Sequence, residues 1–318
     1  MKSLKESLQR IGEMNASTST LKIPSDFHSV PSSSLRHMMR AMSSPRLNTW
    51  SPADETEFSN EVWTEECQGL TSIGQSWYIA SNNDGRRAIY RFAFGSWDEL
   101  GWISLPNGIG DHIGGLTSHK GIIYVPTHGP TGPKVWILDA DLVTLGVGDL
   151  SDKPGVKDDG DISGWCAVNP WNGFYYTSGG HKRTRVHAYD PNDGFSYQGY
   201  LALKRPKING IQGGYFSSTG RLYINSDAYS ASNHDPPLTG TKDVRAYSAL
   251  NGHYFGSCPV PYDEDYPAEE EMEGFTFLKR HGPDGQTTDL HVVILDNDWP
   301  DRDDVRIVHF AVPDPSLI

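Results

Sequence analysis

The chain has 318 residues, 21% of them charged and 36% hydrophobic, so it can bury a core and is not disordered as a whole. Its formal charge is −13 without a long Lys/Arg run, which argues against a general nucleic-acid or anionic-membrane surface. The 33 glycines, 15 tyrosines and 9 tryptophans suit many short strands and tight turns better than a helical bundle.

The three cysteines, Cys67, Cys166 and Cys258, show no CxxC spacing and are expected to be reduced, buried thiols. The first 14 residues lack the apolar centre of a signal peptide. No apolar run approaches the roughly 20 residues of a membrane helix. We therefore expect a cytoplasmic protein that binds neither membranes nor nucleic acid.

Residues 1–60 differ from the rest and are predicted to form a partly helical, partly extended arm. Apolar residues recur there at helical spacing around a Ser/Thr-rich stretch, 15–34. These residues are Leu4, Leu8, Ile11, Leu35, Met38, Met39 and Met42. The Met-rich stripe is expected to pack on the main domain, with partner binding or self-association as the alternative.

From residue 61 onward a longer period replaces the helical one. Five segments share a glycine followed by an apolar strand, and successive glycines are separated by 46, 49, 49 and 61 residues. The glycines are Gly69, Gly115, Gly164, Gly213 and Gly274. The last interval is longer because the insertion 228–242 lies inside the fourth unit.

Each unit continues with further β-rich stretches, and four strands every 40 to 50 residues are typical of a β-propeller blade. Second strands are expected at 76–81, 121–126, 173–178, 221–226 and 290–295. Third strands are expected at 88–94, 134–140, 185–191, 244–250 and 305–312, and a fourth strand, for example, at 195–203. We predict an all-β, five-bladed propeller over residues 61–318.

The fifth unit lacks a fourth strand, because the chain ends after its third. A segment of the arm, around Leu47–Trp50, is expected to supply it and so to remove an open sheet edge. The alternative is a six-bladed ring with an irregular blade built from residues 20–60.

The hairpins "VWILDAD" and "VHAYDPNDG" resemble those of the broad β-propeller superfamily, including quinoprotein-type and gluconolactonase-like propellers. The resemblance covers about residues 62–313. It implies architecture and not activity, because one fold hosts many functions.

A propeller brings the starts of its first strands and the ends of its second strands to one mouth of the central channel. Polar residues gather at these positions. Before the first strands lie Glu66, Asp111, His112, Asp161, Asn209, Glu271 and Glu273; after the second strands lie Asn82, His128, His181, Asp227 and Asp296. Asp and Asn also cap ordinary turns, so each residue alone is weak evidence.

Crowded carboxylates repel one another unless a cation or a proton intervenes. Glu66, Asp161, Asn209 and Glu271 are the candidate ligands of a divalent cation, with calcium, magnesium or manganese favoured over zinc. Propellers of the gluconolactonase type hold a cation over the channel with acidic and Asn ligands, and the resemblance implies the same possibility here.

Histidine suits a general base because its unperturbed pKa lies near neutrality. His112, His128 and His181 are candidates, with Asp111 beside the first. Metal-free acid–base catalysis by Asp111, Asp161 and Glu271 is the alternative. Aromatic rings are expected either to stack on a sugar-like ligand or to pack between blades; they are Trp63, Trp165, Trp171, Tyr229 and Trp299. Asn82, Asp227 and Asp296 are expected to contact the ligand by hydrogen bonds.

These features favour an enzyme, of hydrolase or lyase/isomerase type, that acts on a small polar or cyclic molecule at the channel mouth. Two alternatives are a lectin-like binding propeller and a protein-interaction scaffold. Lectin propellers repeat one ligand set in every blade, whereas the polar residues here differ from blade to blade. That asymmetry favours one specialised central site.

Overall fold

The structure is a computed structural model, and its description covers residues 50–318 with gaps. The gaps are residue 84 and residues 156–163, 181–182, 205–207, 228–241, 263–269, 283–284, 297–302 and 313–317. For residues 279–282 and 285–287 the description is limited to the backbone.

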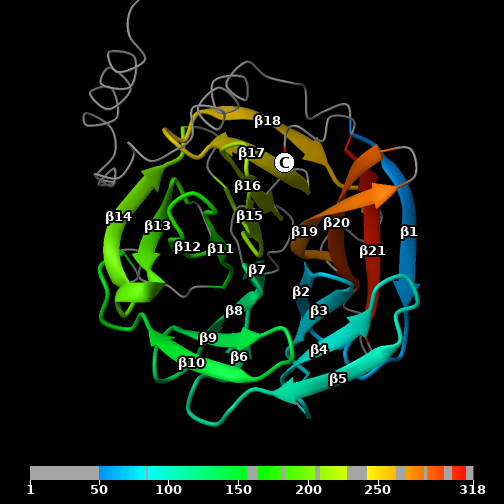
Figure 1. Ribbon diagram of the computed structural model, residues 1–318, viewed down its shortest axis with the longest axis horizontal. Coiled ribbons are helices and arrows are strands. Elements are labelled where there is room, and N and C mark those ends of the chain that lie inside the picture. Colours follow the sequence, from blue (N-terminus) through cyan, green and yellow to red (C-terminus); the bar gives the residue numbers. More distant parts are fainter. Residues whose placement is uncertain are drawn as a thin grey trace, which may run out of the picture.

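The described strands form five antiparallel blades around one axis, as predicted from the glycine-marked repeat (Figure 1). Blade 1 contains β2 (Cys67–Ile73), β3 (Ser76–Ser81), β4 (Ala88–Ala93) and β5 (Glu99–Ser104). Blade 2 contains β6 (His112–Ile113) and β7 (Thr117–His119), then β8 (Ile122–His128), β9 (Lys134–Asp139) and β10 (Thr144–Asp149). Blade 3 contains β11 (Ala167–Val168), β12 (Tyr175–Thr177), β13 (Arg185–Asp190), the 3₁₀ turn η3 (Pro191–Asp193) and β14 (Ser196–Ala202).

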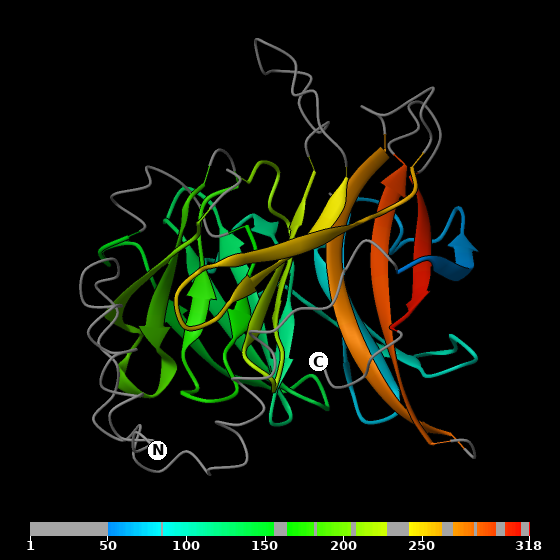
Figure 2. The same ribbon diagram turned by 90° about the horizontal axis from the view of Figure 1, so that it is seen from above.

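The last two blades complete the ring. Blade 4 contains β15 (Gly214–Phe216), β16 (Arg221–Ser226), β17 (Asp243–Ser248) and β18 (Tyr254–Pro259). Blade 5 contains β19 (Glu270–Gly282), β20 (Gly285–Asp296), β21 (Asp304–Ala311) and β1 (Pro52–Phe58). Figure 2 shows the long β19–β20 hairpin projecting beyond its neighbours at one end of the ring.

The outermost strand of blade 5 comes from the amino-terminal side of blade 1. Strand β1 runs antiparallel to β21, with Thr56 opposite Ile307. It begins at Pro52, a few residues after the stretch expected to supply a fourth strand. Trp50 lies in the core, where its ring is 6.0 Å from that of Phe277. The helical stretches expected between residues 1 and 49 lie outside the described residues.

Apolar side chains fill the spaces between neighbouring blades. One such cluster combines Leu70 and Trp77 of blade 1 with Val293 and Ile307 of blade 5. All three cysteines are buried and unpaired with one another, and burial raises the pKa of Cys67 to about 12. In the described part of the chain, no helix has the length and apolar character needed to cross a membrane.

The repeat glycines lie where the inner strands approach one another most closely. A Cβ on Gly69 would lie 3.0 Å from the Cα of Gly274 and 3.4 Å from that of Gly115. A Cβ on Gly115 would lie 1.9 Å from the backbone oxygen of Gln212. The repeat therefore needs glycine because backbones from different blades touch at the axis.

Candidate active site at the axial mouth

Strand pairing places the predicted polar ends at one end of the ring. Cys67 lies opposite Ser81, His112 opposite His128, and Glu270 opposite Asp296, so first-strand starts adjoin second-strand ends. Four predicted site residues, Asp161, His181, Tyr229 and Trp299, lie outside the described residues.

Two β-bulges shape this end of the axis. The pairing of β2 with β3 shifts between Cys67 and Gly69, and that of β19 with β20 shifts between Met272 and Phe275. A bulge carries an unpaired extra residue and re-aims its side chain. Here the residues that precede the axial glycines are Gln68 and Glu273.

We use the name axial cluster for five side chains at this position: Gln68, His112, Gln212, Glu271 and Glu273. Contacts across the blades connect them. His112 Nε2 lies 3.1 Å from Gln68 Oε1, and Gln212 Nε2 donates to Glu273 Oε1 at 3.4 Å. The cluster therefore joins side chains from blades 1, 2, 4 and 5.

His112 is a neutral imidazole with both nitrogens engaged. The Asn82 amide nitrogen donates to Nδ1, so Nε2 carries the proton and donates to Gln68. Burial, the neighbouring His128 and the Arg87 charge lower the pKa of His112 to about 4. This weak basicity does not suit the general-base role predicted for it, and the ring instead orients Gln68.

Glu273 is the most strongly perturbed carboxyl of the cluster. Its side chain is 1% exposed, and Oε2 accepts no hydrogen bond from any described residue. Burial raises the pKa of Glu273 well above its usual value, and the charges of Glu271 and Asp227 raise it further. A hydrogen bond from protonated Glu273 to Glu271 acts in the same direction. All of these effects favour the protonated form of Glu273 relative to an ordinary exposed carboxyl.

Blade 4 holds the backbone that carries Glu273. Asp227 Oδ2 accepts from Met272 N at 2.6 Å, and the Asn225 amide nitrogen donates to the carbonyl oxygens of Met272 and Glu273. Lys242 Nζ donates to the carbonyl oxygen of Glu270. These contacts fix both ends of the bulge that directs Glu273 to the axis.

Asp227 was expected to contact a ligand, but it forms an interior ion pair instead. Lys242 Nζ lies 2.8 and 2.9 Å from its two carboxylate oxygens, and neither side chain is exposed. Asn82 is likewise buried and bridges blades 1 and 2, since its Oδ1 accepts from Ile113 N at 2.8 Å. Both side chains are engaged in contacts that join neighbouring blades.

The described aromatic candidates do not line the mouth. Trp63 is 4% exposed and packs on Phe92, while Trp165 is fully buried and donates to Ser178 Oγ. Trp171 lies in the turn between β11 and β12, which is at the opposite end of the ring. Trp63 lies in the turn before β2 and Trp165 just before β11, and both indoles are buried against neighbouring side chains.

The remaining candidates surround the cluster without forming a compact ligand set. Glu66 and Asp111 are exposed, and Glu66 N donates to Asp303 Oδ2 at 3.0 Å. The His128 ring lies 4.3 Å from that of His112. Asn209 accepts from Ser226 Oγ through its carbonyl oxygen, and Asp296 ends β20. Among the described residues, no three His, Cys, Asp or Glu side chains are close enough together to hold a metal ion.

Gln68, Gln212 and Glu273 received no role from sequence, although a signal for them exists. Each stands directly before a repeat glycine, in "QG", "QGG" and "EG". Since those glycines meet at the axis, the preceding position is the one that borders it. The repeat alone does not reveal this, because glycine contacts become visible only in three dimensions.

No family model matches the chain, and neither does any curated protein. Among solved structures, it is similar to a tail fibre of a Staphylococcus aureus phage, with 14% identity and a TM-score of 0.52 over 89% of this chain and 57% of that one. It is also similar to a luciferin-regenerating enzyme, with 14% identity and a TM-score of 0.41 over 76% of each chain. A putative 6-phosphogluconolactonase from Bacteroides uniformis gives 13% identity and a TM-score of 0.38 over 74% and 68%. These likenesses show the propeller fold alone.

Proposed function

We propose that the axial cluster is the active site of an enzyme that hydrolyses a C–O bond in a small polar or cyclic molecule. The observation that carries this proposal is the contact between two carboxyls at the axis: Glu273 is buried, with a pKa raised well above its usual value, and Glu271 lies beside it. Two carboxyls whose environments separate their pKa values can divide the roles of general acid and general base.

In the proposed reaction, Glu273 gives its proton to the departing oxygen as the C–O bond breaks. Glu271 accepts a proton from the water whose oxygen forms the new bond to carbon. The proton then passes from Glu271 to Glu273 along the hydrogen bond between them, which restores the starting state. Gln68 and Gln212 supply amide groups that orient the polar groups of the substrate.

A divalent cation at the mouth remains a second proposal. Its proposed ligands are Glu66, Asn209 and Glu271, together with Asp161, which lies outside the described residues. A bound cation would favour the ionised form of Glu273 and so lower its pKa. Adding a divalent ion should therefore lower the pKa of Glu273 if a cation binds at the mouth, and leave that pKa unchanged if none binds.

Ligand binding without turnover is the alternative of a different class. Three of the five cluster side chains form hydrogen bonds and take no part in proton transfer: Gln68, His112 and Gln212. A site of this kind can hold a neutral polyhydroxylated molecule and release it unchanged.

The test is turnover of two substrate series, small lactones and nitrophenyl glycosides, by wild type and by Glu273→Gln. If Glu273 is the general acid, the variant loses about 10²–10⁴-fold in kcat/KM while keeping its fold by circular dichroism. Glu57→Gln, an exposed carboxyl of β1, is the matched control and should turn over like wild type. Full activity in Glu273→Gln refutes the assignment. Saturable ligand binding without turnover by wild type favours the binding module.

A further inference from the structure

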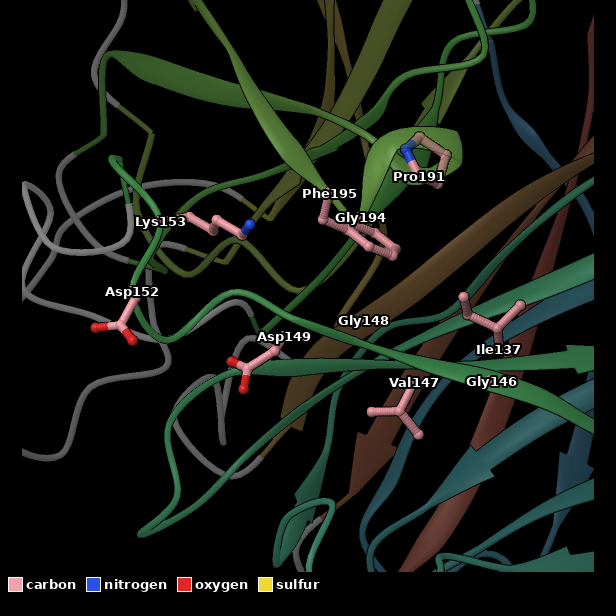
Figure 3. A pocket seen from close by; sticks show the side chains of 10 residues that line it. All are labelled: Ile137, Gly146, Val147, Gly148, Asp149, Asp152, Lys153, Pro191, Gly194 and Phe195. Carbon is pink, nitrogen blue, oxygen red and sulfur yellow. The ribbon is translucent and has the colours of Figure 1, made fainter.

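A groove on the outer wall of the ring lies far from the axial cluster in the fold. It runs between β10, the outermost strand of blade 2, and the Pro191–Phe195 segment of blade 3. Its volume is about 480 Å³, within the roughly 300–1,000 Å³ typical of ligand sites. Figure 3 shows three charged side chains, Asp149, Asp152 and Lys153, at one end and Ile137 and Val147 at the other.

Two glycines of β10 shape the floor of this groove in different ways. A Cβ on Gly148 would lie 2.2 Å from the ring of Phe195, so only glycine lets the ring pack against the strand at this position. A Cβ on Gly146 would meet nothing within 4 Å, so the space above it is open. Phe195 itself has a φ of 56°, a costly backbone state for an aromatic residue that is often found at ligand-binding positions.

Among the described strands, the one that forms the groove, β10, pairs on one side only, with β9. Val143, Leu145 and Val147 are 55%, 54% and 45% exposed, and residues 144–148 carry no charge. By contrast, the outer strand β1 has three acidic residues and begins with a proline. Charges and proline protect edge strands from pairing with other chains, and β10 has neither before its last residue.

Two carboxylates, Asp149 and Asp152, and the ammonium group of Lys153 line the charged end of the groove. Hydrogen bonds from the Ser151 side chain and backbone lower the pKa of Asp149, and the charges of Lys134 and Lys153 add to this effect. Both carboxylates are exposed. A cationic group of a partner can lie against them, and an apolar stem matches Ile137 and Phe195.

We propose that β10 is a docking edge for an extended segment of another protein, which lays a Lys or Arg side chain along this groove. The segment adds a fifth strand to blade 2, and its backbone pairs with the open edge of Thr144–Asp149. Its apolar residues cover Leu145 and Val147. Long basic side chains combine an apolar stem with a charged head, as the two ends of the groove require.

The probe is a fluorescein-labelled, capped peptide, Thr-Val-Arg-Val-Thr, titrated by polarisation and by amide NMR shifts. Gly146→Leu fills the open space without entering the left-handed backbone region and should weaken binding by about tenfold or more. Leu100→Thr, which changes an exposed apolar residue on the outer strand β5, is the matched control and should bind like wild type. Thermal melts of both variants establish that they are folded.

Two further peptides separate the contribution of the Arg charge to binding from that of the backbone hydrogen bonds. Replacing Arg by Glu should weaken binding by about tenfold, because the head then faces Asp149 and Asp152. N-methylation of alternate amides should abolish it, since it removes the strand pairing. No NMR shift on β10 up to about 1 mM peptide, or equal binding of the Arg and Glu peptides, overturns the proposal. A dimer in light scattering that Val147→Lys abolishes, without peptide binding, assigns the edge to a second copy and equally overturns it.

Discussion

Glu273→Gln should make the protein more stable than wild type, by an amount that grows with pH. The folded state raises the pKa of this buried carboxyl well above its ordinary value of 4.5. Between 4.5 and the raised value, the unfolded chain has released the proton while the folded chain still holds it. The free energy of unfolding of wild type therefore falls with rising pH in this window.

The magnitude follows from linkage. When the folded chain binds one proton more than the unfolded chain, the unfolding free energy falls by about 1.4 kcal/mol per pH unit. Glutamine has the same shape and does not titrate, so the variant lacks this pH dependence. The difference between variant and wild type should thus be small below pH 4.5, rise at up to about that slope, and level off above the raised pKa.

Urea unfolding at closely spaced pH values measures this difference directly. Glu57→Gln removes an exposed carboxyl from β1 and controls for the loss of one negative charge. A stability difference that does not change with pH would refute the reasoning, because Glu273 would then titrate alike in the folded and unfolded chain. That result would also remove the general acid from the proposed reaction.

Three other perturbations test neighbouring parts of the argument. Lys242→Met should lower the unfolding free energy by about 3–5 kcal/mol in urea titrations, because it leaves the Asp227 charge buried without a partner; adding Asp227→Asn should recover part of the loss. Gly115→Ala should cost more than about 2 kcal/mol or prevent folding, whereas Gly146→Ala should leave the melting temperature nearly unchanged, which calorimetry measures. NMR should show that the His112 ring titrates with a pKa of about 4. Its contribution to the unfolding free energy is then lost as the pH falls from 6.5 towards 4, because the unfolded chain binds the proton first. A titration midpoint near 6.5 would contradict the burial of this ring.

The architecture could be predicted because the repeat rests on a backbone requirement. At four of the five repeat glycines, Gly69, Gly115, Gly213 and Gly274, a Cβ would lie 3.0 Å or less from the backbone of another blade. Strand alternation then follows from burying one blade against the next. What the repeat does not specify is which side of each strand end faces the axis. Asp227 was therefore assigned to the mouth, whereas its carboxylate turns inward to Lys242.

The site was harder to predict because two bulges create it. A strict alternation of side chains places Glu271 and Glu273 on one face of β19, but the shift after Met272 changes the direction of the later residue. The same holds for Gln68 in β2. Residue types such as Gln68 and Glu273 do not identify a bulge, so its position cannot be predicted from the sequence alone. Of the axial cluster, sequence therefore named His112, Glu271 and Glu273 but not Gln68 and Gln212.

The bulges of blades 1 and 5 adjoin the closure of the ring. Inner-strand pairings shift in blades 1, 2 and 5, whereas those of blades 3 and 4 are described only beyond the repeat glycine. Blades 1 and 5 pack directly on each other, Gly69 and Gly274 approach closely across that junction, and β1 adds the outer strand of blade 5. Weakening closure should therefore disturb Glu273 before it disturbs the far blades. Deleting residues 1–58 from the chain tests this: the infrared carboxyl band of Glu273, identified by its loss in Glu273→Gln, should shift while amide protection in blade 3 persists. Simultaneous loss of both would instead indicate that the ring unfolds as a single unit.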